Sequence, residues 1–477
     1  MSGSVPSFDL VVVGSGPGGQ NAAVQAAKLG KTVLLVERDT AVGGECVHRG
    51  TIPSKTLRES AMTALRMTQL GLANGRLDEQ QIETSSLMKR QELVTAAHEH
   101  YISNQLERNE IQVWKGHARF VSPWELEITS VDGSSRRALG SAVVVATGSR
   151  PRTPPNIPID HESVLDSDSI LSMIYVPQSL VVLGAGVIAC EYASIFAALG
   201  TKVTLIDKAP RPLSFMEPEL TDRFCTWFER HGGRYLPGRQ VKTVDWDGVA
   251  TVTTVLEDGE TIESDKLLCA LGRIANLRGL DIEAAGLKAT DRGYLRVDAN
   301  CRTEVPHIYA VGDVIGPPAL AATSMEQGRR AARHAFGHAN DAIGGTTPIG
   351  IYTIPEMACV GLGEAQAREK HGEVLVGYAK YDELARAQIN GDREGLLKLI
   401  ASADGKQVLG AHVIGESASE LVHVAQLAMI AGMTPEVFIE QIFNFPTLAE
   451  AYRVAALEIL EKLESAKRDR ARATAAS

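Results

Sequence analysis

The segment Val11-Val12-Val13-Gly14-Ser15-Gly16-Pro17-Gly18-Gly19 decides the fold, because it joins a short apolar run to a G-x-G-x-x-G loop. It predicts a buried strand, a turn that only glycine can make, and a helix whose first turn faces an anion. Gly14 makes the turn, Gly16 lets the backbone approach a pyrophosphate, and Gly19 lets the helix pack closely on the strand. A second strand at 32–36 ends in Glu37, whose carboxylate is placed to accept hydrogen bonds from a ribose diol.

The same unit recurs 170 positions later (184 against 14), as Val181-Val182-Leu183-Gly184-Ala185-Gly186-Val187-Ile188-Ala189. Its second strand, at 202–206, ends in Asp207. One such loop alone is a weak signal and could be a chance glycine turn. Two complete strand, turn, helix, strand and acid units in register predict an α/β fold with two Rossmann-like dinucleotide-binding domains.

Length and charge limit the other possibilities. A chain of 477 residues is too long for one hydrophobic core, so about three domains are expected. The net charge of −10 argues against nucleic acid as a partner, since phosphate binding needs a basic face. No apolar run approaches the roughly 18 residues needed to span a bilayer. The N-terminus lacks the basic region and cleavage site of a signal peptide, so no membrane partner is expected.

Six cysteines stand far apart, at positions 46, 190, 225, 269, 301 and 359. They form no C-x-x-C pair and no spacing typical of metal ligands. This distribution predicts a cytoplasmic, reducing location, with neither a disulfide framework nor a metal site.

Several motifs resemble those of the flavoprotein pyridine nucleotide-disulfide oxidoreductases, over about residues 8–463. The stretch from Gly43 to Lys55 is similar to their C-x-x-x-x-C-I-P-S-K segment, which carries the redox disulfide. Three further segments resemble the ATG segment, the G-R-x-x-N segment and the second FAD motif of that family: residues 143–149, 270–276 and 303–313.

The resemblance implies a domain order and a set of cofactor contacts. It divides the chain into an FAD-binding part (1–150), an NAD(P)-binding domain (151–276), a second FAD or central part (277–346), an α+β interface domain for dimerisation (347–465) and a flexible tail (466–477). FAD is expected at Gly14, Gly16, Gly19, Glu37, Arg38, Lys55, Thr147, Gly148, Gly312, Asp313 and Ala321. The nicotinamide nucleotide is expected at Gly184, Gly186, Ala189, Asp207, Lys208, Arg211, Gly272 and Arg273.

Two departures from the family pattern narrow the activity. The second redox cysteine is replaced by Thr51, and the histidine of the family's H-P-T-x-x-E segment is replaced by Phe445. One branch, the soluble or Si-specific pyridine nucleotide transhydrogenases, has a lone cysteine before G-T-I-P-S-K and F-N-[YF]-P-T-x-A-E-A-Y-R-V-A-A near its end. This chain matches both patterns, at 46–55 and 443–456.

The resemblance also implies roles at the reacting centre. Lys55 is expected beside the flavin with Glu191 as its ion-pair partner, although both could be surface charges. Thr51 is expected to lie against the isoalloxazine and to offer a hydrogen bond but no electrons. Cys46 is a candidate nucleophile or redox sensor, but without a partner cysteine a buried packing residue is the favoured interpretation. His48 is expected to be structural.

Cofactor choice is expected to depend on the loop after the second strand. Asp207 favours the free 2′-hydroxyl of NAD, whereas Lys208 and Arg211 could pair with the 2′-phosphate of NADP or be solvated loop charges.

These features predict an FAD enzyme that moves hydride from NADPH to NAD+ by a ping-pong mechanism without a redox disulfide. The alternatives are a flavin-dependent quinone or dye reductase, a dihydrolipoamide dehydrogenase-like paralogue, and a non-enzymatic flavin-binding sensor. The resemblance further implies a homodimer, or a higher homo-oligomer, in which Phe445 and Glu450 lie at the partner's flavin.

Overall fold

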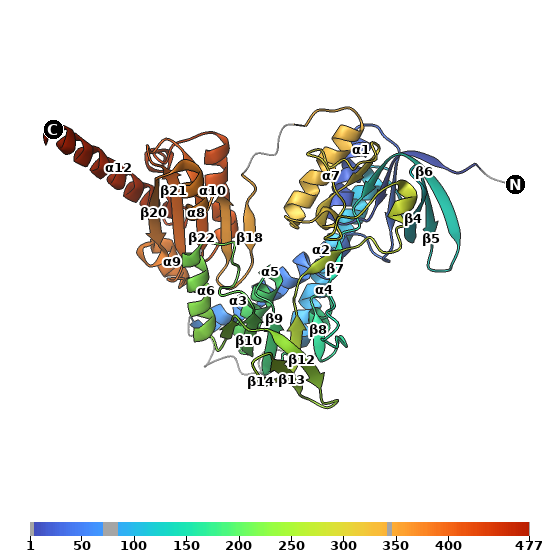
Figure 1. The fold of residues 1–477 in the computed structure, drawn as a ribbon, viewed down its shortest axis with the longest axis horizontal. Coiled ribbons are helices and arrows are strands. Elements are labelled where there is room, and N and C mark those ends of the chain that lie inside the picture. Colours follow the sequence, from blue (N-terminus) through green and yellow to red (C-terminus); the bar gives the residue numbers. More distant parts are fainter. Residues whose placement is uncertain (1–3, 70–83, 341–345, 477) are drawn as a thin grey trace.

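Each glycine-rich unit forms the parallel centre of its own sheet in the computed structural model, which describes residues 4–69, 84–340 and 346–476, and the first sheet continues into antiparallel strands at one side. Figure 1 shows three lobes: the first dinucleotide domain at the right, the second at the bottom and the C-terminal domain at the left. The α/β fold expected from the sequence is confirmed.

The first sheet is built around β1, which pairs in parallel with β2 on one side and with β6 on the other. β6 is long enough to pair with three strands: β1 lies along one edge, while β5 pairs with the early residues and β17 with the late residues of the other edge. The strands of this sheet are β3 (Gln112–Lys115), β2 (Val33–Glu37), β1 (Ser7–Val13), β6 (Ser135–Val145), β5 (Glu125–Thr129), β4 (His117–Ser122) and β17 (Ile308–Ala310). Helix α1 (Pro17–Lys28) packs against α7 (Ala321–Ala335) at Gly18 and Gly328, because a Cβ on Gly328 would overlap the Gly18 carbonyl and a Cβ on Gly18 would press on Ser324.

The second sheet is entirely parallel and buried within its domain. Its strands are β11 (Arg234–Pro237), β10 (Lys202–Asp207), β9 (Ser179–Leu183), β15 (Lys266–Cys269) and β8 (Val164–Asp166). The helices of the domain are α5 (Val187–Ala198) and α6 (Pro218–Arg230). A small antiparallel sheet follows, made of β12 (Val241–Trp246), β13 (Val252–Leu256) and β14 (Thr261–Ser264). The ribbon of β7 (Ser149–Pro151) and β16 (Arg273–Ala275) joins the two dinucleotide domains.

The C-terminal domain has an antiparallel sheet of β18 (Ile349–Ile351), β19 (Met357–Gly361), β22 (Val408–Ile414), β21 (Leu396–Ser402) and β20 (Val374–Lys380). Its helices are α8 (Glu364–His371), α9 (Ala385–Asn390), α10 (Ala418–Ile430), α11 (Val437–Glu440) and α12 (Glu450–Ala476). α12 continues through residues 466–476, where the sequence suggested a flexible tail, and it projects from the lobe in Figure 1. The reason is composition, since Ala, Arg and Lys favour helix even without packing.

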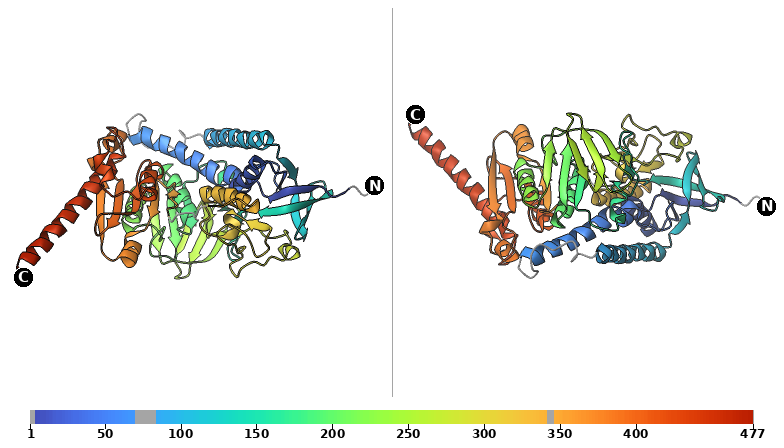
Figure 2. Two further views of the ribbon diagram at one scale, coloured as in Figure 1. Left: turned by 90° about the horizontal axis from the view of Figure 1, so that it is seen from above. Right: turned by 90° about the horizontal axis from the view of Figure 1, so that it is seen from below.

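Two long helices connect the lobes. They are α3 (Thr51–Gln69) and α4 (Thr84–Arg108), and both views in Figure 2 show them along one side. Leu57 and Ala61 of α3 enter the core of the second domain. Further along the helix, Arg58 pairs with Glu356 at 3.2 Å and Arg66 with Glu416 at 2.6 Å. α3 is therefore braced by all three lobes, and it carries Lys55 at its start.

A buried ion cluster joins the second domain to the C-terminal sheet. Nζ of Lys398 lies 2.7 Å from a carboxylate oxygen of each of Glu217, Glu219 and Glu364. These three carboxylates form a cluster with the geometry of a metal site, but the ammonium group already neutralises part of their charge. The cluster therefore links the start of α6 to the C-terminal domain through ion pairs.

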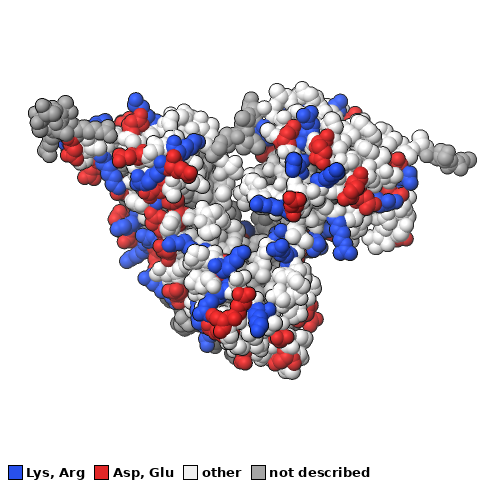
Figure 3. Space-filling model, viewed as in Figure 1, with Lys and Arg blue, Asp and Glu red and all other residues white. Residues whose placement is uncertain are grey.

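None of the described helices has the length and apolar character needed to cross a bilayer. On the face drawn in Figure 3, acidic and basic side chains are mixed over all three lobes.

Candidate functional site

A cavity of about 970 Å³ runs from the first glycine loop to the junction of the three lobes. Its walls come from the first loop, from α2 (Gly44–His48), from the starts of α3, α5 and α7, and from residues 348–352. This volume is at the upper end of the range for small-molecule sites. The cavity contains most of the residues expected to bind FAD: Gly14, Gly16, Glu37, Arg38, Lys55, Thr147, Gly148, Gly312, Asp313 and Ala321.

The first loop has the geometry that its glycines predict. Gly14 has a φ of +101°, and a side chain there would meet the carbonyl oxygen of Ala146. Gly19 does not line the cavity; it packs on Gly14, where a Cβ would overlap the carbonyl. The carboxylate of Glu37 accepts hydrogen bonds from the amides of Ser15 at 2.9 Å and Asp39 at 3.0 Å. The acid therefore fixes the loop as well as facing the cavity.

The second loop repeats this arrangement. Gly184 also has a φ of +101°, and an added Cβ would lie 2.7 Å from the carbonyl oxygen of Ala270. Asp207 accepts from the amides of Ala185 at 2.8 Å and Ala209 at 2.6 Å, as Glu37 does in the first unit. The loop residues Gly184, Gly186 and Ala189 and the acid Asp207 lie outside the cavity. Their contact with a nicotinamide nucleotide stays a prediction.

The expected ion pair between Lys55 and Glu191 is present, and its position beside the flavin stays a prediction. Nζ of Lys55 donates to a carboxylate oxygen of Glu191 at 2.7 Å, across the boundary between the two dinucleotide domains. The other oxygen of Glu191 accepts from the amide of Tyr352 at 2.9 Å. The Tyr352 ring lies 4.9 Å from the ammonium group, a distance suited to a cation–π interaction. Three lobes thus fix one positive charge in the cavity wall.

Cys46 and Thr51 lie together in the same wall. Burial raises the pKa of the Cys46 thiol, and the nearby Thr51 side chain acts in the opposite direction. All six cysteines are free. Cys46 is half-buried and lines the cavity, so the expectation of a buried packing residue was wrong in this respect. His48 does not line the cavity; its Nε2 lies 2.8 Å from the Val42 carbonyl oxygen, in line with a structural role.

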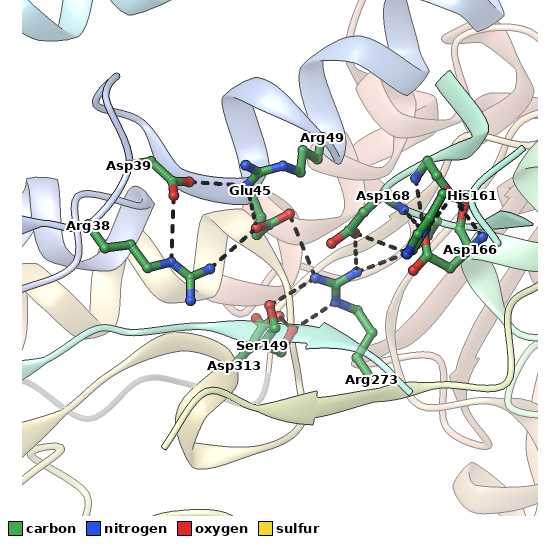
Figure 4. Close-up of polar contacts among 12 residues, drawn as sticks. Arg38, Asp39, Glu45, Arg49, Ser149, His161, Asp166, Asp168, Arg273 and Asp313 are labelled. Carbon is green, nitrogen blue, oxygen red and sulfur yellow. Dashed lines mark hydrogen bonds and ion pairs between the residues drawn. The ribbon is translucent and has the colours of Figure 1, made fainter. Parts of the chain in front are cut away.

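A charge network that sequence reasoning missed lies between the two dinucleotide domains, and Figure 4 shows Glu45 at its centre. Glu45 is 2.9 Å from Arg49, and 3.9 Å from both Arg38 and Arg273. Burial, followed by the nearby charge of Asp168, raises the pKa of the Glu45 carboxyl. The only signal for this network in the sequence is the charged Glu45, which stands between two glycines and Cys46.

The ribbon between the domains positions Arg273. Its Nε donates to the Ser149 hydroxyl at 2.8 Å, and Ser149 in turn donates to Asp313 at 2.6 Å. Arg273 also pairs with Asp168 at 3.2 Å. The expected nicotinamide residue Arg273 therefore lies in the cavity with the expected FAD residue Asp313.

Three buried polar atoms in the cavity wall have no hydrogen-bond partner among the residues that the structure describes. They are the hydroxyls of Thr147 and Tyr192 and one carboxylate oxygen of Glu45. Buried polar groups are almost always satisfied, so these atoms indicate a polar ligand. Together with the glycine loop and Glu37, they fit a dinucleotide such as FAD.

Of the two basic residues expected to bind the 2′-phosphate of NADP, one is held by other groups of the chain and the other is exposed. Arg211 donates to the Pro218 carbonyl at 2.9 Å and pairs with Asp222 at 2.6 Å, so its guanidinium group is held at the start of α6. Lys208 is exposed. Gly272 has a φ of +102°, and its carbonyl accepts from the Arg152 amide at 3.0 Å.

Phe445 does not line the cavity, and 74% of its surface is exposed to solvent. The neighbouring Ile442 is 98% exposed. A site that uses Phe445 would therefore need a second chain.

Family models match most of the chain. Residues 8–328 match the pyridine nucleotide-disulphide oxidoreductase model, and residues 347–456 match the dimerisation domain of the same family. The chain is 44% identical over 464 residues to the soluble pyridine nucleotide transhydrogenase of Mycobacterium bovis (strain BCG / Pasteur 1173P2), an alignment that covers 96% of this chain and 98% of that protein. It is 40% identical over 460 residues to the protein of the same name from Colwellia psychrerythraea, with the same coverage.

Solved structures agree with these relatives. LpdA from Mycobacterium tuberculosis superposes with a TM-score of 0.87 at 27% identity, covering 95% of this chain and 99% of that one. The Cu(II) complex of the flavoprotein disulfide reductase RclA from Escherichia coli superposes with a TM-score of 0.86 at 26% identity, with the same coverage. The chain therefore belongs to the pyridine nucleotide-disulphide oxidoreductase family of flavoproteins, within its soluble pyridine nucleotide transhydrogenase branch.

Proposed function

We propose that this protein is a cytoplasmic, FAD-dependent transhydrogenase that catalyses NADPH + NAD+ = NADP+ + NADH by a ping-pong mechanism. One observation carries the proposal: the cavity joins an FAD-type glycine loop to the Lys55–Glu191 pair, with Thr51 where a disulfide reductase needs its second cysteine. The names of the relatives at 40–44% identity support it.

When bound, FAD supplies the two-electron chemistry that links the two half-reactions. The residues that would hold it are Gly14, Gly16, Glu37, Arg38, Thr147, Gly148, Asp313 and Ala321. Lys55 contributes a fixed positive charge where negative charge develops on reduction. Glu191 and Tyr352 hold that ammonium group in place. Thr51 and the protonated Cys46 thiol offer hydrogen bonds without accepting electrons.

The test separates the two half-reactions. The purified protein is mixed with NADPH in a stopped-flow instrument, the loss of flavin absorbance is followed, and the reduced protein is then mixed with NAD+. A transhydrogenase is reoxidised by NAD+ within the turnover time. Fast reoxidation by a quinone, with none by NAD+, would instead identify a quinone reductase.

The absence of a redox disulfide predicts the electron capacity. Titration with dithionite should consume two electrons per FAD, because Thr51 cannot form a disulfide with Cys46. No long-wavelength thiolate-to-flavin band should appear at neutral pH, since burial keeps the Cys46 thiol protonated. Uptake of four electrons would reveal a disulfide that this proposal omits.

Cofactor choice gives a second prediction. Arg211→Ala should raise the Michaelis constant for NADPH about tenfold and leave that for NADH nearly unchanged, as expected for the loss of one charge-assisted hydrogen bond. Asp207→Asn should mainly weaken NADH. Asp222→Asn should lower the constant for NADPH, because Arg211 is held by Asp222 at 2.6 Å and would be released. Equal shifts for both cofactors in every variant would show that Arg211 only caps α6.

The active form is proposed to be a homodimer. The dimerisation-domain match supports this, and so do the exposed apolar side chains on that domain, which are Leu427, Ile430, Met433, Ile442, Phe445 and Leu457. Burying such side chains against a second copy is favourable. Phe445 and Glu450 would then complete the partner's site.

A further inference from the structure

Glu45 has a position that none of the family motifs explains. One of its carboxylate oxygens, Oε2, is buried in the cavity wall without a hydrogen-bond partner, while the other accepts from Arg49 at 2.9 Å. Leaving a buried acceptor unpaired is unfavourable, so the oxygen is placed for a group that enters the cavity.

That group is identified by what Glu45 lies beside. A Cβ on Gly44 would lie 3.0 Å from Cα of Gly16, and the Gly43 amide donates to the Ser15 hydroxyl at 2.9 Å. The start of α2 is therefore packed onto the glycine loop. That loop leads into α1, whose N-terminus is the place for a pyrophosphate.

The charges around Glu45 do not favour an ionised carboxylate beside a bound pyrophosphate. Positive groups approach from three elements: Arg38 after β2, Arg49 after α2, and Arg273 on β16. Each of them already pairs with acidic residues, because Asp39 binds Arg38 and Arg49, and Asp168 binds Arg273. Asp313 reaches Arg273 through Ser149, and His117 lines the cavity further along. An ionised Glu45 would thus face the pyrophosphate with little spare positive charge.

We propose that Glu45 binds FAD as a neutral carboxylic acid and that FAD binding takes up one proton from solvent at this residue. The Oε2–H group donates to an anionic oxygen of the pyrophosphate, while Oε1 still accepts from Arg49. The inference rests on the proposed function only in assuming that FAD occupies this cavity.

The direction of the pH dependence follows from the charges. Burial and Asp168 already raise the pKa of Glu45 in the protein without ligand, and a neighbouring dianion raises it further. A group whose pKa is higher in the complex than in the free protein makes its full contribution to binding at pH values below the pKa in the free protein. The benefit is lost as pH rises toward the pKa in the complex. The dissociation constant for FAD should therefore increase with pH, by up to about tenfold per unit within that window.

The test uses the full chain. Holoprotein is diluted at a series of pH values from about 5.5 to 8.5, all above the ordinary pKa of a glutamate, and released FAD is measured by its fluorescence. FAD-depleted protein is also titrated with FAD by calorimetry in buffers of different ionisation enthalpy, which gives the protons taken up. The expected result is up to one proton per FAD and a dissociation constant that rises with pH.

Two variants isolate Glu45. Glu45→Gln keeps a donor and an acceptor without a charge, so it should abolish the proton uptake and bind FAD more tightly than the native protein at the high end of the range. Any slope that other groups contribute persists in this variant and is subtracted. The matched control is Glu416→Gln, an arginine-paired carboxylate of similar side-chain exposure (22% against 25%) that does not line the cavity. It should leave the proton uptake unchanged.

The outcomes are distinguishable. Tight FAD binding without proton uptake in the native protein overturns the inference, and this measurement needs no variant to fold. An unchanged slope in Glu45→Gln overturns it as well. A folded protein that binds no FAD at any pH would instead defeat the proposed function.

Discussion

Replacing Lys55 by methionine should slow reduction of the bound flavin by NADPH about 10²–10³-fold, the usual cost of removing one fixed charge or donor at a reacting centre. Lys55 contributes a cation in the cavity wall, held 2.7 Å from Glu191 and over the Tyr352 ring. Methionine keeps the length of the side chain and removes the charge. The measurement is the limiting rate in stopped flow at saturating NADPH, with FAD content checked by absorbance.

The control for this prediction is Arg58→Met, which removes a cation from the same helix but outside the cavity. Arg58 is also a cation on α3 that pairs across lobes, with Glu356 at 3.2 Å, and it does not line the cavity. Its loss should reduce stability and leave the limiting rate within a fewfold of the native value. Equal slowing in both variants would mean that Lys55 acts only by bracing α3. Lys55→Arg, which keeps the charge, should recover part of the rate.

The elements predictable from sequence were those whose geometry is local. Gly14 and Gly184 adopt the same φ of +101° and face the same kind of strand-end carbonyl, because a strand-to-helix turn of this type leaves no room for Cβ. The acids Glu37 and Asp207 follow from the same repeat, and each holds two amides of its own loop region. Spacing along the chain is sufficient to infer such contacts.

What the sequence could not give depends on how distant segments meet. Glu45, Asp168 and Arg273 come from α2, the loop after β8 and β16, and only the closure of two domains brings them together. The contacts of Arg211 are another case. A basic residue in a loop after the second strand suggests a phosphate contact, but the start of α6 supplies a carbonyl and Asp222 within reach. Neither partner is apparent from the loop's own sequence.

The second large effect concerns the two departures from the disulfide-reductase pattern taken together. Thr51→Cys should form a disulfide between Cys46 and the introduced cysteine, because position 51 corresponds to the second redox cysteine and both residues line the same cavity wall. The variant should then accept four electrons per FAD in a dithionite titration. It should still reduce lipoamide or glutathione disulfide poorly, since Phe445 offers no proton to the leaving thiolate.

Adding Phe445→His to Thr51→Cys should raise the rate of disulfide reduction about 10²–10⁴-fold over the single variant, the range typical of a positioned general acid or base. Phe445 is 74% exposed within one chain, so its replacement should cost little stability before the second chain is considered. The control is Phe445→His alone, which lacks the disulfide and should reduce neither substrate. A single Thr51→Cys variant as fast as the double variant would show that proton transfer is not limiting. In that case Thr51 and Phe445 would be independent losses. A gain that requires both changes would instead show that the thiol pair and its acid were lost as one unit. Hydride transfer between nucleotides needs neither of them.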